Sequence, residues 1–136
     1  MSTYEIIDEP KVKASSHLVV NPIVILLAAM IVPMFLTIPF FGRWWLPFVW
    51  LMFNGYILGS PTLIKEIILS LVGLVSLYLV FELSAYLKQI EPFLSFESFF
   101  YYVRIILYGV FFLFLYLVVF RQIIPFEIFL YMKKKY

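Results

Sequence analysis

The stretch IILYGVFFLFLYLVVF, residues 105–120, decides the fold because it contains no charged residue and is apolar on every side. A membrane barrel strand would alternate polar and apolar residues over about ten positions, and this stretch does not. A helix embedded in lipid has this uniform apolar pattern. Backbone amides in hydrocarbon must be satisfied within the protein, which a helix achieves by itself. The sequence therefore predicts an all-α fold.

The apolar character extends outward from this stretch to cover residues 18–120. Of the 136 residues, 65% are hydrophobic, 21% are aromatic and 13% are charged, which is far from the composition of a soluble domain. The charged residues that interrupt the apolar region are Arg43, Lys65, Glu66, Glu82, Lys88, Glu91, Glu97 and Arg104. At about 20 residues per crossing, the region has room for roughly four short crossings. We expect a small polytopic integral membrane protein with four transmembrane helices.

Three segments are expected along the chain. A flexible polar tail at residues 1–17 precedes a membrane domain at 18–121, and an interfacial basic tail follows at 122–136. The four helices are expected at about residues 22–41, 44–59, 61–87 and 99–120. The first and third begin at Asn21-Pro22 and Ser60-Pro61, where a capping residue precedes a proline in the first helical position.

The first two helices allow two interpretations. Pro33 and Pro39 lie inside the first and are expected to kink it. The second is only about 20 Å long at 1.5 Å per residue. The pair is therefore either two crossings or a re-entrant hairpin with Arg43 at its tip. Burying that charge would cost about 2.5–3.5 kcal/mol, which favours two crossings.

The distribution of basic residues predicts the orientation. With four crossings, most of them fall on one side of the membrane, which predicts that both termini are cytoplasmic. Lys133 and Lys134 occupy the fourth and third positions from the end, a spacing that resembles a retrieval signal of the endoplasmic reticulum. The same lysines are equally consistent with simple anchoring in a bacterial inner membrane. The two membranes are not distinguished.

Glu82 and Arg104 are predicted to form an ion pair inside the membrane. They lie at similar depth if the third and fourth helices form an antiparallel hairpin, and leaving either charge unpaired in lipid is costly. Tyrosines one helical turn from each charge could complete their hydrogen bonds: Tyr78, Tyr86, Tyr101 and Tyr108. A structural staple is the favoured role. A functional polar pocket and snorkelling of both side chains are the alternatives.

A stripe of small or polar residues on the third helix is predicted to pack against other helices, because small side chains let helix backbones approach closely in lipid. It consists of Ser70, Gly73, Ser76 and Ser84. The contact is expected within the chain, with a partner protein as the alternative. Asn54 in the second helix is expected to bond across to another helix.

Several classes of site are excluded by residue counts. The chain has no cysteine and one histidine, His17, so no thiolate or histidine metal centre and no embedded serine–histidine hydrolase is expected. No glycine-rich phosphate loop occurs among the five glycines. The net charge of +2 is too small to indicate nucleic-acid binding. We expect no metal, no cofactor and no nucleic-acid partner.

These observations favour a non-enzymatic accessory, assembly or scaffold subunit of a larger membrane complex. Its expected partners are the lipid bilayer and other integral membrane subunits. A small homo-oligomeric transporter or channel is the alternative, although residues 18–41 lack the acidic residue that small multidrug transporters carry in their first helix. A membrane-embedded lipid-modifying protein is a second alternative, for which only the Glu82 and Arg104 region offers polar groups.

Overall fold

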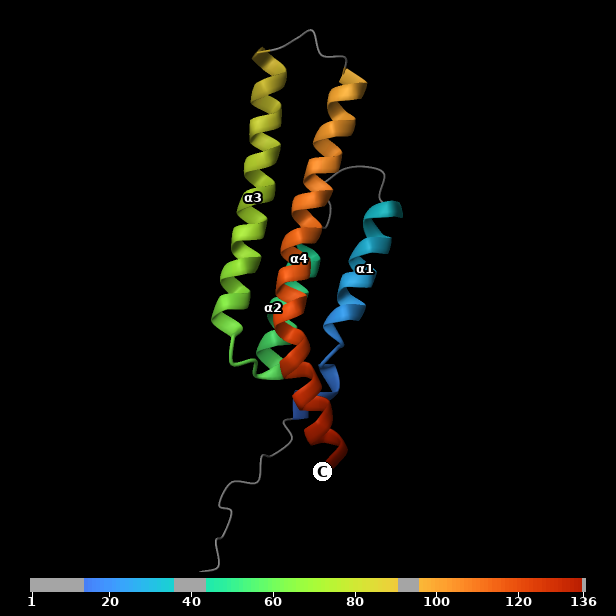
Figure 1. Ribbon diagram of the computed structural model, residues 1–136, viewed down its shortest axis with the longest axis vertical. Coiled ribbons are helices and arrows are strands. Elements are labelled where there is room, and N and C mark those ends of the chain that lie inside the picture. Colours follow the sequence, from blue (N-terminus) through green and yellow to red (C-terminus); the bar gives the residue numbers. More distant parts are fainter. Residues whose placement is uncertain (1–13, 36–43, 91–95, 136) are drawn as a thin grey trace, which may run out of the picture.

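The computed structural model describes residues 14–35, 44–90 and 96–135, and this part of the chain forms four α-helices (Figure 1). A 3-10 helix, η1 (Ala14–Leu18), precedes α1 (Pro22–Phe35), α2 (Leu46–Leu58), α3 (Leu63–Ile90) and α4 (Phe96–Lys135). No strand occurs in the described ranges. The prediction of an all-α fold is therefore confirmed.

The helices run alternately up and down, with α4 in contact with each of the other three. η1 contacts α2, and it lies at the same end of the molecule as the end of α4 (Figure 1). α3 and α4 lie side by side and extend well beyond α1 and α2 at the opposite end. The structure thus has a part where four helices overlap and a part made of two helices only.

Three helices lie close to their expected positions, and their ends have local causes. α2 ends at Gly59, whose φ of +67° is a left-handed conformation that glycine adopts without strain. The Gly59 N–H donates to the Tyr56 carbonyl and the Ser60 N–H to the Gly55 carbonyl. α1 is described only to Phe35, so Pro39 and the proposed hairpin tip at Arg43 lie outside the described residues.

α4 is much longer than the expected helix at 99–120, because it continues through Pro125 to Lys135. A proline inside a helix removes one backbone hydrogen bond and crowds the preceding turn. The residues after it are compatible with a helix, and three lysines in the last turn interact favourably with the helix dipole. The segment 122–135 is thus the end of α4, and its interfacial location stays a prediction.

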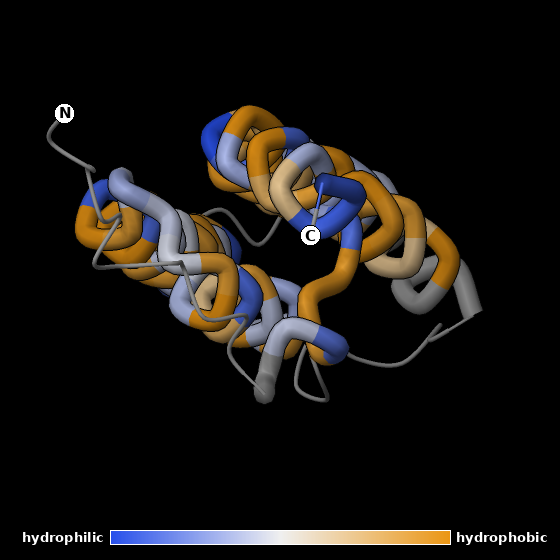
Figure 2. Tube along the Cα trace, turned by 90° about the horizontal axis from the view of Figure 1, so that it is seen from below, coloured by the Kyte–Doolittle hydropathy of each residue, from blue (hydrophilic) through white to orange (hydrophobic). Residues whose placement is uncertain are grey.

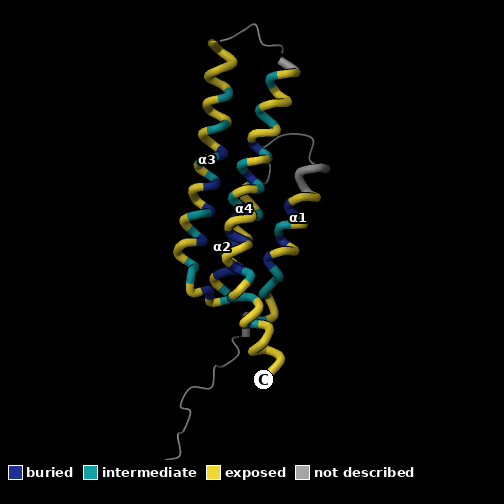
Figure 3. Tube along the Cα trace, in the orientation of Figure 1, coloured by how far each residue is buried: buried dark blue, intermediate teal, exposed yellow. Residues whose placement is uncertain are grey.

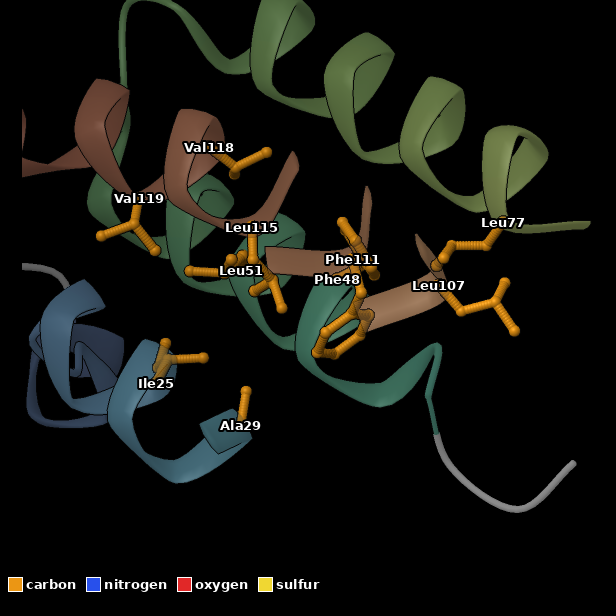
Figure 4. Close-up of a cluster of buried hydrophobic side chains, with 10 residues drawn as sticks. All are labelled: Ile25, Ala29, Phe48, Leu51, Leu77, Leu107, Phe111, Leu115, Val118 and Val119. Atoms are coloured by element: carbon orange, nitrogen blue, oxygen red, sulfur yellow. The ribbon is translucent and has the colours of Figure 1, made fainter. Parts of the chain in front are cut away.

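The hydrophobic core lies where the four helices overlap (Figures 3 and 4). Phe48 of α2 meets Phe111 of α4 edge to face, with ring centroids 5.6 Å apart. Leu51 and Leu115 are fully buried beside them. Residues 78–90, which follow Leu77 in α3, and residues 98–106, which precede Leu107 in α4, include no buried side chain.

We call the four-helix part the bundle and the two-helix part the arm. The bundle comprises η1, α1, α2 and the segments 63–77 and 107–122. The arm comprises residues 78–90 of α3 and 98–106 of α4.

Two helices are long and apolar enough to cross a membrane, in the segments 63–90 and 98–135. Only 17% and 28% of the residues in their most apolar stretches are buried, so they are unlike the core helix of a soluble protein. Hydrophobic residues predominate along the helices (Figure 2), and many of the large ones are exposed. α1 and α2 are shorter than 18 residues. Length and composition thus support two candidate spans.

Candidate functional site

Polar side chains from α2, from the turn after it, from α3 and from α4 meet inside the bundle. The turn at Gly59 brings Ser60 and Thr62 to the start of α3, where the Glu66 N–H donates to the Thr62 carbonyl at 3.0 Å. We call the group of interacting side chains the polar cluster. Its members are Asn54, Ser60, Thr62, Glu66 and Gln122.

Among the described residues, Glu66 is the only aspartate, glutamate, lysine or arginine that is buried, and none of its surface is exposed. Its Oε1 accepts hydrogen bonds from Ser60 Oγ and from Thr62 Oγ1, the latter at 2.8 Å. Its Oε2 accepts a hydrogen bond from Gln122 Nε2 at 2.8 Å. Both carboxyl oxygens are therefore held by groups of the protein itself.

Gln122 connects Glu66 to the rest of the bundle. Its Nε2 also donates to the Leu51 carbonyl of α2 at 2.7 Å. Its Oε1 accepts from Asn54 Nδ2 at 3.2 Å, and Asn54 Oδ1 accepts from the Val20 N–H at 2.9 Å. One connected set of hydrogen bonds thus joins the segment before α1 to α2, α3 and α4.

Gly55 makes this connection possible because α2 passes directly over the Glu66 and Gln122 side chains. A Cβ atom at Gly55 would lie 2.5 Å from Glu66 Oε2 and 2.8 Å from Gln122 Nε2. Real Cβ atoms do not approach other atoms so closely, so any side chain at residue 55 would push the carboxyl and the amide apart.

The predicted packing stripe divides into two pairs. Ser70 and Gly73 are buried, and a Cβ at Gly73 would lie 2.8 Å from Phe114 Cβ of α4. Ser76 and Ser84 instead donate to carbonyls of their own helix, to Val72 at 2.7 Å and to Val80 at 2.6 Å. Only the first pair therefore faces neighbouring helices at close range. Asn54 does bond across to another helix, through Gln122.

Ser70 lies one helical turn after Glu66 and is fully buried. Its Oγ has no hydrogen-bond partner among the described residues. A buried hydroxyl without a partner costs free energy, so Ser70 is the least satisfied group near the polar cluster.

The two residues of the predicted ion pair lie in the arm. Glu82 is exposed and Arg104 is half-buried. The Arg104 guanidinium carbon lies 5.5 Å from the centre of the Tyr108 ring. Tyr78, Tyr86 and Tyr101 are exposed. Pairing of the two charges within a bilayer stays a prediction.

Lys133 and Lys134 lie exposed in the last turn of α4, and His17 lies exposed in η1. The role of the lysines as a retrieval signal also stays a prediction. Across the described ranges, no group of three or more histidine, cysteine, aspartate or glutamate side chains comes together in a way that could hold a metal ion.

Four members of the polar cluster were missed by the sequence analysis: Ser60, Thr62, Glu66 and Gln122. One signal could have found two of them. The antiparallel register that places Glu82 level with Arg104 also places Glu66 close to the level of Gln122. The sequence analysis places Gln122 in the tail, because Arg121 is typical of a helix end. Gln122 was therefore not considered as a partner for Glu66.

The polar cluster combines one carboxyl group, two hydroxyls and two amides in a buried, closed set of hydrogen bonds. This arrangement can fix the mutual positions of three helices. Its members include no cysteine and no histidine, the side chains that most often act as a nucleophile or a general base. Comparison with protein-family models, with curated proteins and with solved structures finds no match to this chain.

Proposed function

We propose that the chain is an integral membrane protein whose four helices all lie in the bilayer, with both termini on the cytoplasmic face. In α3 the charge-free segment 67–81 lies between Glu66 and Glu82, and in α4 the segment 105–120 lies between Arg104 and Arg121. At 1.5 Å per residue these segments are about 22–24 Å long. The 13 residues of α2 give about 20 Å.

These three lengths therefore agree with one thin apolar band. An average hydrocarbon core is about 30 Å thick, so the bilayer must thin locally or the flanking charged side chains must snorkel. The polar cluster lies at one boundary of this band, and Glu82 and Arg104 lie at the other. The common end of η1 and α4 in Figure 1 supports an even number of crossings.

Labelling tests the four crossings cleanly because the chain has no cysteine. Single cysteines at Ser2, Lys88 and Lys135 are exposed to a membrane-impermeant thiol reagent in intact cells. We expect only residue 88 to react from outside. Reaction of one terminus alone from outside would require an odd number of crossings and would overturn the proposed arrangement.

Within this arrangement, we propose that the protein is a non-enzymatic accessory or assembly subunit of a larger membrane complex. The arm carries the proposal. Beyond Glu82 and Arg104 it exposes large apolar side chains, among them Leu87 at 45%, Tyr86 at 61% and Tyr101 at 64%. These residues lie past the boundary of the apolar band, where lipid tails cover them poorly. Apolar surface in such a place typically marks a site of protein contact.

Co-purification in mild detergent tests this role. We expect a partner in stoichiometric amount with the wild type, and loss of that partner in the arm variant Leu87→Ala with Tyr101→Ala. The matched control is Leu71→Ala with Leu113→Ala, because these residues are 50% and 55% exposed but lie inside the apolar band. Equal loss of the partner in both variants, or retention in both, would contradict binding through the arm.

A small homo-oligomeric transporter or channel is the second candidate, and the buried Glu66 favours it. Ionisable residues inside a membrane domain often mark the path of an ion or substrate. In this structure, however, the Glu66 carboxyl contacts only side chains of the protein. Purification of a pure homo-oligomer whose assembly survives the arm variant would favour this candidate over the accessory role.

A further inference from the structure

Glu66 is a buried carboxyl group with no cationic partner among the described residues. Within the described residues, its side chain forms hydrogen bonds with Ser60, Thr62 and Gln122, which are uncharged. The nearest ionisable residues along each packed element are exposed: His17 of η1, Tyr56 of α2, Lys65 of α3, and Arg121 and Glu127 of α4. A carboxylate in such a place lacks the compensation that buried charges in proteins normally have.

The hydrogen bonds of the carboxyl group require one more hydrogen than its neighbours supply. Three oxygens lie within hydrogen-bond distance of one another: Glu66 Oε1, Ser60 Oγ and Thr62 Oγ1. The hydroxyl pair is 3.2 Å apart, and Thr62 Oγ1 is 2.8 Å from Glu66 Oε1. Three contacts need three hydrogens, but two hydroxyls have only two. An ionised carboxylate would leave one contact as two facing lone pairs.

We propose that Glu66 is a proton-binding site and that its bound proton completes this ring. Glu66 Oε1 carries the proton, so its contact with Ser60 Oγ, described above with the hydroxyl as donor, now has the acid as donor. The Ser60 hydroxyl then donates to Thr62 Oγ1, and the Thr62 hydroxyl donates back to Glu66 Oε1. Glu66 Oε2 remains the acceptor for Gln122 Nε2. A neutral acid in this ring avoids the large cost of placing a charge in the bundle.

The site is filled by a proton and by no larger cation, because the surrounding contacts leave little space. Gln122 Nε2 already lies 2.8 Å from Glu66 Oε2, and the backbone of Gly55 packs against both groups. Loss of the proton would place an uncompensated charge where α2, α3 and α4 meet. Proton binding is therefore coupled to the closed arrangement of the bundle, whether or not the arm binds a partner.

Infrared spectroscopy at neutral pH tests the proposal directly, because a protonated carboxyl group absorbs apart from a carboxylate. We expect the wild type in lipid vesicles to show the band of a protonated acid, and Glu66→Gln to lack it. Glu82→Gln is the matched control, since Glu82 lies exposed on the same helix, and this variant keeps the band. Absence of the band from the wild type, or its survival in Glu66→Gln, would overturn the proposal.

A second variant covers the case in which Glu66→Gln does not fold. In Ser60→Ala the acid can still donate to Thr62 Oγ1, so the band persists at a shifted frequency. An unshifted band would mean that the proton is held elsewhere, which would also overturn the proposal.

Discussion

α3 and α4 run side by side through the bundle and through the arm, but the burial and hydrogen bonding of their polar residues differ between the two parts. In the bundle, Glu66 and Gln122 are fully buried, and each makes at least three hydrogen bonds. In the arm, Glu82 is exposed, and the half-buried Arg104 lies over a tyrosine ring. The contrast follows from α2, which covers the first pair and does not reach the second.

A third helix therefore converts a helix hairpin into a site that can enclose polar groups. Two helices alone leave most of each surface exposed, so a charge between them can turn outward. With α2 packed across them, the same charge must find partners inside. The bundle and the arm are thus expected to respond very differently to the same kind of substitution.

The largest difference is expected for glutamine replacements. Gln122→Leu leaves Glu66 Oε2 and Asn54 Nδ2 without the partner that Gln122 supplies, and it removes one hydrogen bond from the Leu51 carbonyl. Each unsatisfied group costs about 1–3 kcal/mol, so we expect a loss of about 2 kcal/mol or more in the free energy of unfolding. Gln89→Leu in the arm, where Gln89 is exposed, should change it by less than about 0.5 kcal/mol. Denaturant unfolding in detergent measures both, and equal losses would contradict the contrast.

Glycine replacements should also separate regions, at a smaller scale. Gly55→Ala forces the Glu66 carboxyl and the Gln122 amide away from α2, and overpacking of this kind costs about 1–3 kcal/mol. Gly109→Ala is the control, because a Cβ there meets nothing within 4 Å. It should stabilise α4 by about 0.5–1 kcal/mol through helix propensity. Thermal unfolding of the two variants should therefore shift in opposite directions.

Neutralising the arm charges is expected to have a modest effect. Glu82→Gln and Arg104→Gln should each lower stability by at most about 1 kcal/mol, because Glu82 is exposed and Arg104 is only half-buried. Folded yield from a membrane fraction measures the effect. Larger losses in both variants, recovered by Glu82→Arg with Arg104→Glu, would show instead that the two charges pair in the bilayer.

The smallest effect is expected at Ser70. Its buried hydroxyl has no partner among the described residues, so Ser70→Ala removes an unsatisfied group and should raise stability by up to about 1 kcal/mol. Ser76→Ala is the control, since the Ser76 hydroxyl bonds within its own helix. A marked loss of stability in Ser70→Ala alone would reveal a buried partner, such as an ordered water molecule.

The sequence was sufficient for the helical fold, because apolar residues on all sides of a long segment leave the backbone few alternatives. Asn54 was also recognised, since a lone amide in an apolar helix needs a partner. Its partner Gln122 lies 68 residues away, and this pairing depends on how α2 crosses α4. No local pattern in either helix contains that crossing, which is why the polar cluster was not predicted as a site.

The end of the fourth helix was misjudged for a different reason. Arg121, Gln122 and Pro125 together are typical of a helix end in a sequence, yet α4 continues to Lys135. Gln122 is buried against α2 and α3, so the helix is held by tertiary hydrogen bonds at the position where its sequence suggests a stop. Local stop signals are weaker than such contacts.

The position of Gln122 also orders the events of biosynthesis. Because the chain is made from its amino terminus, Asn54 and Glu66 are synthesised before the residue that binds them both. Until α4 is in place, Asn54 Nδ2 and Glu66 Oε2 lack the hydrogen-bond partner that Gln122 supplies. The last helix thus completes the hydrogen bonds of the helices made before it, and an incomplete chain differs from the finished protein in its unsatisfied polar groups.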